Sequence, residues 1–219
     1  KVRLVHSVGY PNPNFSHFRA TDIWMSASDS NVQITSGWAG RYLNDQYPNY
    51  PVGYPNTQMP DPLGIQIGSS TSLTFQGPSV NTGISITSAT NFYNLINGIQ
   101  DPAPATPAGD ALKYVRLVAQ QSNQYSARIV AAANAVPTQG TYPTNNTLAD
   151  QLKIVARLVK GGLKTRVYMV SLGGFDTHSI QTNTDTTTGT HATLMQRSSA
   201  GDDVFRIWQK GEIKCQCRY

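Results

Sequence analysis

Charged residues and long hydrophobic runs are both scarce in this sequence. Only 13% of the 219 residues are charged. No stretch approaches the roughly 20 apolar residues that a membrane-spanning helix needs. No basic, apolar and small-residue signal opens the chain. The sequence as given therefore predicts no membrane partner and carries no export signal of its own.

Cysteine is nearly absent, and the excess positive charge is dispersed. The only two cysteines, Cys215 and Cys217, lie one residue apart, so a bridge between them would be strained and would close almost no loop. The net charge is +5, but the basic residues are scattered rather than clustered in a run. We therefore expect neither a disulfide-stabilised domain nor a nucleic-acid partner.

Hydrophobic residues make up 39% of the chain, enough for the core of a single domain. Apolar spacing and capping residues predict helices in four segments, and β-branched or apolar runs predict strands near the N-terminus and after the last helix. Residues 63–87 predict β-structure at the periphery of a sheet. The helices are expected at 16–25, 37–43, 106–130 and 147–160, and the strands at 1–9 and 166–172.

The order of these elements indicates the fold class. The helix ending at Gly161-Gly162 is followed by an apolar strand that runs into Gly173-Gly174. This order is typical of an α/β fold, with a mostly parallel sheet flanked by helices and ligands at the carboxyl ends of the strands. Residues 47–62 carry five of the 13 prolines, which predicts a long Tyr/Pro/Asn-rich surface loop without regular hydrogen bonding.

The residues that follow the last strand are the first candidate site. Asp176 and His178 lie two apart, so on an extended loop they would point to the same side and could reach one metal ion. His191 could supply a third ligand, and such a set suits a divalent metal. The alternative is structural: Asp176 would cap a turn and His178 would form a local hydrogen bond.

A second polar cluster lies near the N-terminus. His17 and Arg19 could meet an anionic substrate group, with Asp22 orienting one of them. Alternatively, this is a helix start in which Asp22 pairs with Arg19. Ser171 is not expected to be a nucleophile, because Met169 stands where a nucleophile elbow needs glycine.

Several motifs together resemble a known family. The chain is similar to an uncharacterised bacterial family of Tat-exported, sulfatase-like proteins in the alkaline phosphatase superfamily, over about residues 1–196. The matching segments are Val8–Asn14, Ser16–Arg19, Asp22–Trp24, Gly37–Leu43 and Gly173–His178, with His191.

The resemblance implies a partial alkaline-phosphatase-like core and a hydrolase of phosphate or sulfate esters. It implies divalent metal ions, zinc, manganese or calcium, with Asp176, His178 and His191 as ligands, and a small anionic ester substrate near His17 and Arg19. It also implies a periplasmic or secreted location.

Departures from the family pattern limit these expectations. An initial strand ending in Gly-Gly-Asn-Asp and a later Asp-His-Gly motif are missing, so we expect a fragment that carries only part of the family's metal site, and whether it is active on its own stays open. Residues 197–219 do not resemble the family. Codons can be chosen for residues 202–219 that, when they are read one nucleotide later, encode an amino-acid sequence similar to the family's next block. This agreement predicts that the tail is an out-of-frame translation.

Two alternatives stay open: a single-metal carboxylic ester or lactone hydrolase, and a non-catalytic extracytoplasmic binding protein. A sheet edge exposed by the missing strand would favour homo-oligomers.

Overall fold

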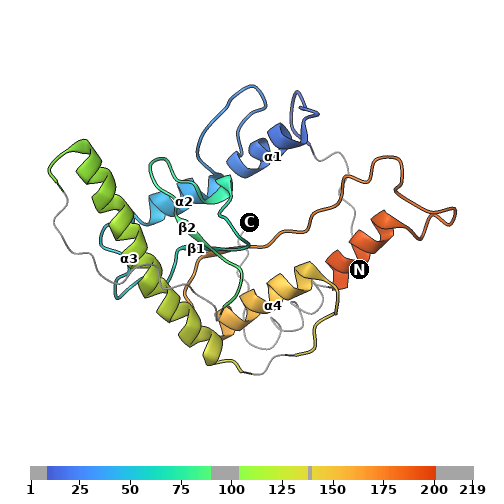
Figure 1. Cartoon of the computed structure of the whole chain (residues 1–219). Coiled ribbons are helices and arrows are strands. Elements are labelled where there is room, and N and C mark those ends of the chain that lie inside the picture. The colour runs from blue at the N-terminus through green and yellow to red at the C-terminus, as the bar shows by residue number, and fades with distance from the viewer. Residues whose placement is uncertain (1–8, 90–103, 138–139, 201–219) are drawn as a thin grey trace.

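A small parallel sheet flanked by helices forms the centre of this mixed α/β protein (Figure 1). The computed structural model describes residues 9–89, 104–137 and 140–200. Residues 190–200 are helical as well. The elements are α1 (His17–Ser26), α2 (Trp38–Gln46), β1 (Gly64–Ile67), the 3₁₀ helix η1 (Leu73–Phe75), β2 (Gly83–Ile86), α3 (Pro107–Asn134), α4 (Thr147–Lys160) and β3 (Val167–Met169).

The three strands run parallel in the order β2-β1-β3. Gly64 of β1 pairs with Gly83 of β2 on one side and with Val167 of β3 on the other. The parallel sheet and its flanking helices were predicted correctly. Within residues 63–87, β2 lies at the edge of the described sheet as predicted, but the peripheral position was wrong for β1. β1 is the central strand because β3, from much later in the chain, pairs along its second edge.

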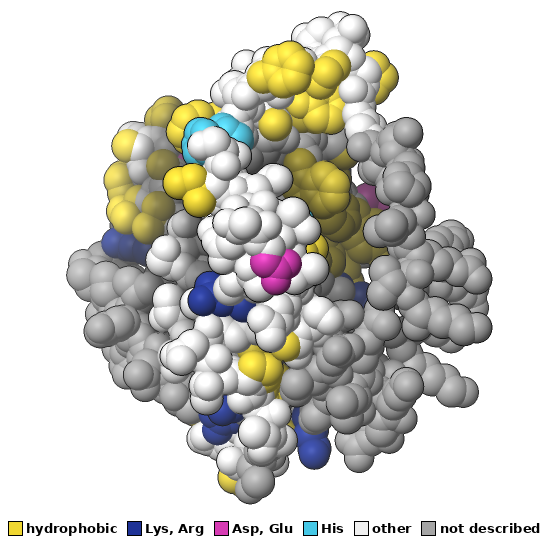
Figure 2. Space-filling model, turned by 90° about the vertical axis from the view of Figure 1, so that its right-hand side faces the viewer, with side chains coloured by type: hydrophobic (Ala, Val, Ile, Leu, Met, Phe, Trp, Pro, Cys, Tyr) yellow, Lys and Arg dark blue, Asp and Glu magenta, His cyan; other side chains and the backbone are white. Residues whose placement is uncertain are grey.

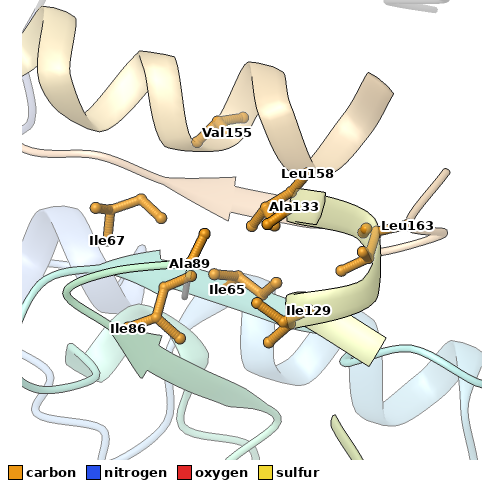
Figure 3. Packing of buried hydrophobic residues seen from close by; sticks show 10 residues of the cluster. Ile65, Ile67, Ile86, Ala89, Ile129, Ala133, Val155, Leu158 and Leu163 are labelled. Carbon is orange, nitrogen blue, oxygen red and sulfur yellow. The ribbon is translucent and has the colours of Figure 1, made fainter. Parts of the chain in front are cut away.

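One face of the sheet packs against α3 and α4 (Figure 3). Ile65 and Ile67 of β1 both point to this face, because side chains two residues apart in a strand lie on the same side of the sheet. The helices contribute small and branched side chains, so they approach the sheet closely. The buried members of this core are Ile65, Ile67, Ile86, Ala89, Ile129, Ala132, Ala133, Val155, Leu158 and Leu163.

The opposite face of the sheet is covered by η1 and the segment around it. Phe75 is fully buried, and its ring lies over Gly64 and Gly83. A Cβ added at Gly64 or Gly83 would come within 2.3 or 2.6 Å of the ring atoms. The two paired glycines therefore form the floor on which this aromatic ring packs, together with Leu43, Tyr50, Met59 and Leu63.

The two long helices begin where the sequence predicts. The Thr106 hydroxyl accepts from the Gly109 N–H at the start of α3, with Pro107 in the first turn. Asn146 caps α4 by accepting from two backbone N–H groups, and Gly161 follows its last residue. α3 extends to Asn134, beyond the predicted end at 130.

The Tyr/Pro-rich segment 47–62 is more ordered than predicted. No helix or strand forms between residues 47 and 62, as predicted, but successive backbone turns link Tyr47 to Tyr50 and Pro51 to Tyr54. The buried Gln121 of α3 donates to the carbonyl oxygens of Pro51 and Tyr54. A helix side chain thus supplies hydrogen-bond donors in a segment where each proline lacks a backbone N–H. Tyr50 and Met59 of this segment also belong to the core around Phe75.

Some predictions fall outside the described residues. The N-terminal strand expected at 1–9 lies almost wholly outside them, as does the tail from 201 onward. The predicted boundary between 196 and 197 falls within the helical segment 190–200. Within the described ranges, no helix is long and apolar enough to cross a membrane.

Candidate functional site

The candidate site begins where β3 leaves the sheet at its carboxyl end. Gln151 of α4 holds this exit through two hydrogen bonds to the backbone of Ser171. Its side-chain nitrogen donates to the Ser171 carbonyl (2.7 Å), and its Oε1 accepts from the Ser171 N–H (2.9 Å). Gln151 was not predicted from the sequence, because a glutamine on a helix gives no signal of such a partner.

Three of the predicted site residues meet beyond this exit. Asp176 Oδ2 lies 3.1 Å from His178 Nε2 and 3.3 Å from His17 Nε2. His17 is the first residue of α1, so the cluster joins two parts of the chain that are distant in sequence. His17 was predicted to be a substrate-binding residue, and its position beside Asp176 was not predicted.

All three side chains are open to solvent. Their exposed fractions are 75% for His17, 80% for His178 and 47% for Asp176. Figure 2 shows a histidine side chain at the surface, beside several hydrophobic side chains. The apolar neighbours in sequence are also exposed, including Phe18 and Phe175. An exchanging ion or small solute can therefore reach this cluster without any opening of the fold.

The backbone brings His178 back toward Asp176. The sequence predicted an extended loop here, but His178 has a φ of 47°, in the left-handed region, and Gly174 has a φ of 91°. The Ile180 N–H donates to the Thr177 carbonyl at 3.1 Å, which closes a turn around His178. A left-handed non-glycine residue costs about 1–2 kcal/mol, so this turn is a local strain at the candidate site.

The structure keeps Arg19 and His191 apart from this cluster. Arg19 Nη2 donates to the carbonyl oxygens of three residues in the loop after α1, Asp29, Ser30 and Val32. His191 is exposed in the helical segment 190–200, and its backbone N–H donates to the Gln181 carbonyl. Among the ion pairs of the described residues, none involves Arg19 or His191.

The donor chemistry fits a divalent metal, but the donors are not closed around one point. Two imidazole nitrogens and a carboxylate are ligands that zinc and manganese accept. Across the described ranges, however, no group of three or more His, Cys, Asp or Glu side chains is placed so that it could hold a metal ion as it stands. The cluster therefore gathers suitable donors without completing their arrangement.

Two further features lie close to the site in sequence. The Thr177 hydroxyl, between Asp176 and His178, is buried without a hydrogen-bond partner among the described residues. An open groove of about 510 Å³ lies between α4, the β3 exit at Val170 and the helical segment 190–200, with Leu148, Leu152 and Met195 among its lining residues. The site loop thus starts beside an apolar groove.

The fold and the cluster define a mixed α/β protein with a solvent-exposed His–Asp–His group beyond the end of a parallel strand. No family model, no curated protein and no solved structure matches this chain.

Proposed function

We propose that this chain is part of a metal-dependent hydrolase of phosphate or sulfate esters, with its site in the loop after β3. The observation that carries the proposal is the meeting of His17, Asp176 and His178 at the carboxyl side of the sheet. In parallel α/β sheets this is the side on which ligands bind. The proposal includes the alkaline-phosphatase-like core, and the periplasmic or secreted location, that the sequence resemblance implies.

The proposed roles follow from the chemistry of each group. Asp176 and His178 would hold a divalent ion, which supplies Lewis-acid polarisation of an ester oxygen when bound. The backbone of Ser171, fixed by Gln151, sets where the site loop starts. The exposed position of the cluster gives an anionic ester direct access to these groups.

An ester panel tests this function. The purified chain is assayed with aryl phosphate, aryl sulfate and aryl carboxylate esters, with zinc, manganese or calcium added in turn. We expect metal-dependent hydrolysis of phosphate or sulfate esters that Asp176→Asn and His178→Ala abolish. Asp185→Asn is the matched control, because Asp185 is an exposed carboxylate that accepts two hydrogen bonds from Thr187 outside the cluster.

The same panel separates the alternatives. A single-metal ester or lactone hydrolase would use three protein ligands and a water, and would cleave carboxylate esters in preference. The presence of three donors in one cluster is the observation that favours this second candidate. Metal binding without cleavage of any ester would contradict the proposed activity, and would favour a binding protein or an inactive fragment.

A further inference from the structure

We infer that a basic surface at the end of the sheet opposite the candidate site binds a sulfated polysaccharide. This surface, which we call the basic edge, lies before the first residues of β1 and β3, where α3 and α4 also end. The inference goes beyond the proposed function and does not depend on it, because the candidate site lies beyond the carboxyl end of β3. The members of the basic edge are Arg128, Arg157, Lys160, Lys164 and Arg166.

The fold brings three of these cations together around the start of β1. The Arg128 Nε donates to Asp61 Oδ1 at 2.7 Å, and the Lys164 backbone N–H donates to Asp61 Oδ2 at 2.8 Å. Two residues further on, the Arg166 backbone N–H donates to the Leu63 carbonyl at 3.0 Å. Cations that are dispersed in the sequence therefore become neighbours in the structure.

The C-terminal ends of α3 and α4 meet at the same place (Figure 1). Gly161, directly after α4, lies so close to Ala132 of α3 that an added Cβ would come within 2.1 Å of the Ala132 carbonyl oxygen. Ala132 follows Arg128 by four residues and therefore lies on the same face of α3. The Arg157 Nε also donates to a carbonyl at the end of α3. Arg157 and Lys160, in the last turn of α4, thus lie at the same edge as Arg128.

Little negative charge offsets the basic edge. Between residues 112 and 175, Asp150 is the only acidic residue in the sequence, and it lies in the first turn of α4, at the other end of that helix. Asp61, the carboxylate bound to Arg128, is fully buried. The edge therefore presents net positive charge to solvent, which an anionic partner can neutralise.

The side chains of Lys164 and Arg166 are presented to solvent beyond the end of α4. Both residues are exposed, and neither takes part in an ion pair among the described residues. Thr165 between them is half-buried, so the two charged side chains alternate with it and point to the same side. The contacts with Asp61 and Leu63 use their backbone N–H groups, so replacing these side chains leaves those contacts in place.

The chemistry of the basic edge favours a sulfated polysaccharide over other polyanions. Three of the five cations are arginines, whose guanidinium groups bind paired oxygens, and a sulfate ester offers the same tetrahedral oxygens as a phosphate ester. Single-stranded nucleic acids need aromatic side chains for stacking, and stable membrane attachment needs a second, apolar anchor. Among the described residues between 116 and 174, no large hydrophobic side chain is exposed. A sulfated polysaccharide carries its charge along the chain and needs neither contact.

Binding to size-fractionated heparin, measured by isothermal titration calorimetry at low and high salt, tests the inference. We expect the unchanged chain to bind with an affinity that falls as salt screens the charges. Lys164→Gln/Arg166→Gln should bind roughly tenfold more weakly, because two exposed ion pairs are lost. The control Lys113→Gln/Arg116→Gln removes the same charge from α3, about 18 Å or more along the helix from Arg128, and should stay within about twofold of the unchanged chain.

Thermal unfolding of each variant checks the fold, and the single variants Lys164→Gln and Arg166→Gln replace the double variant if it unfolds. Equal losses in the edge and control variants would show a response to net charge alone and would overturn the inference. Absence of heparin binding would also overturn it, as would tighter binding of duplex DNA or of anionic lipid vesicles. None of these results affects the metal-dependent ester assay, so the proposed function is tested separately.

Discussion

Asp61 offers a demanding test of how the fold is held together. Its side chain is fully buried, and its two oxygens have different partners. Oδ1 accepts from Arg128 Nε of α3 at 2.7 Å, and Oδ2 accepts from the Lys164 backbone N–H, ahead of β3, at 2.8 Å. One carboxylate thus joins the end of the Tyr/Pro-rich segment to α3 and to the approach of β3.

Asp61→Asn preserves the volume but replaces one acceptor oxygen with an NH₂ group. Whichever way the amide turns, either Arg128 or Lys164 then faces a donor. A hydrogen bond to a charged group contributes about 1.5–3 kcal/mol, and a stranded donor costs about 1–3 kcal/mol. Arg128 is 49% exposed, so water replaces part of its loss. We therefore expect the free energy of unfolding to fall by about 2–3 kcal/mol.

Urea unfolding at pH 7, followed by far-UV circular dichroism and tryptophan fluorescence, measures this change. Asp110→Asn is the control, because Asp110 pairs with Lys113 on the exposed surface of α3 and should change stability by less than about 0.5 kcal/mol. In the double variant Asp61→Asn/Arg128→Met, the loss should be smaller than the sum of the single losses. An Asp61→Asn effect as small as that of Asp110→Asn would refute the reasoning.

Three further predictions concern packing, capping and pH. Gly83→Ala should lower the free energy of unfolding by about 1–3 kcal/mol, measured by urea unfolding, because its methyl group would collide with the buried ring of Phe75; a neutral result would mean that the ring moves freely. Asn146→Ala removes the α4 cap and the hydrogen bond to the Arg197 carbonyl, which together contribute about 1–2 kcal/mol to the free energy of unfolding. The midpoint of thermal unfolding should therefore fall, and an unchanged midpoint would contradict this. Burial raises the pKa of Tyr168 from 10.0 to about 12, so the stability that it confers below pH 10 is lost as the pH rises from 10 through 12. Tyr168→Phe should show a smaller alkaline loss in urea unfolding at pH 9 to 12, and an equal loss would exclude this cause.

Local signals in the sequence predicted the helices well. The starts of α3 and α4 follow from Thr106, Pro107 and the apolar spacing behind them, because capping depends on residues that are adjacent in the chain. The end of α4 at Lys160, directly before Gly161, follows for the same reason. The loop 47–62 was less predictable, because its order depends on Gln121 and Arg128 of α3, which bind it through tertiary contacts.

The sheet and the site depend on distant pairings. Nothing in Gly64–Ile67 shows that a later strand will pair along its second edge and make it central. The meeting of His17 with Asp176 is of the same kind, since no local pattern relates them. The motif around Asp176 and His178 was visible in the sequence, whereas the left-handed turn that brings His178 to the carboxylate was not.

Metal content tests the central claim most directly. The chain is purified without chelators, dialysed, and analysed for zinc, manganese and calcium beside Asp176→Ala, His178→Ala and the control Asp185→Ala. The account predicts near-stoichiometric metal in the unchanged chain and in Asp185→Ala, and its loss from the two site variants. Absence of metal from all four proteins, or equal metal in all four, would contradict a metal site at the end of β3.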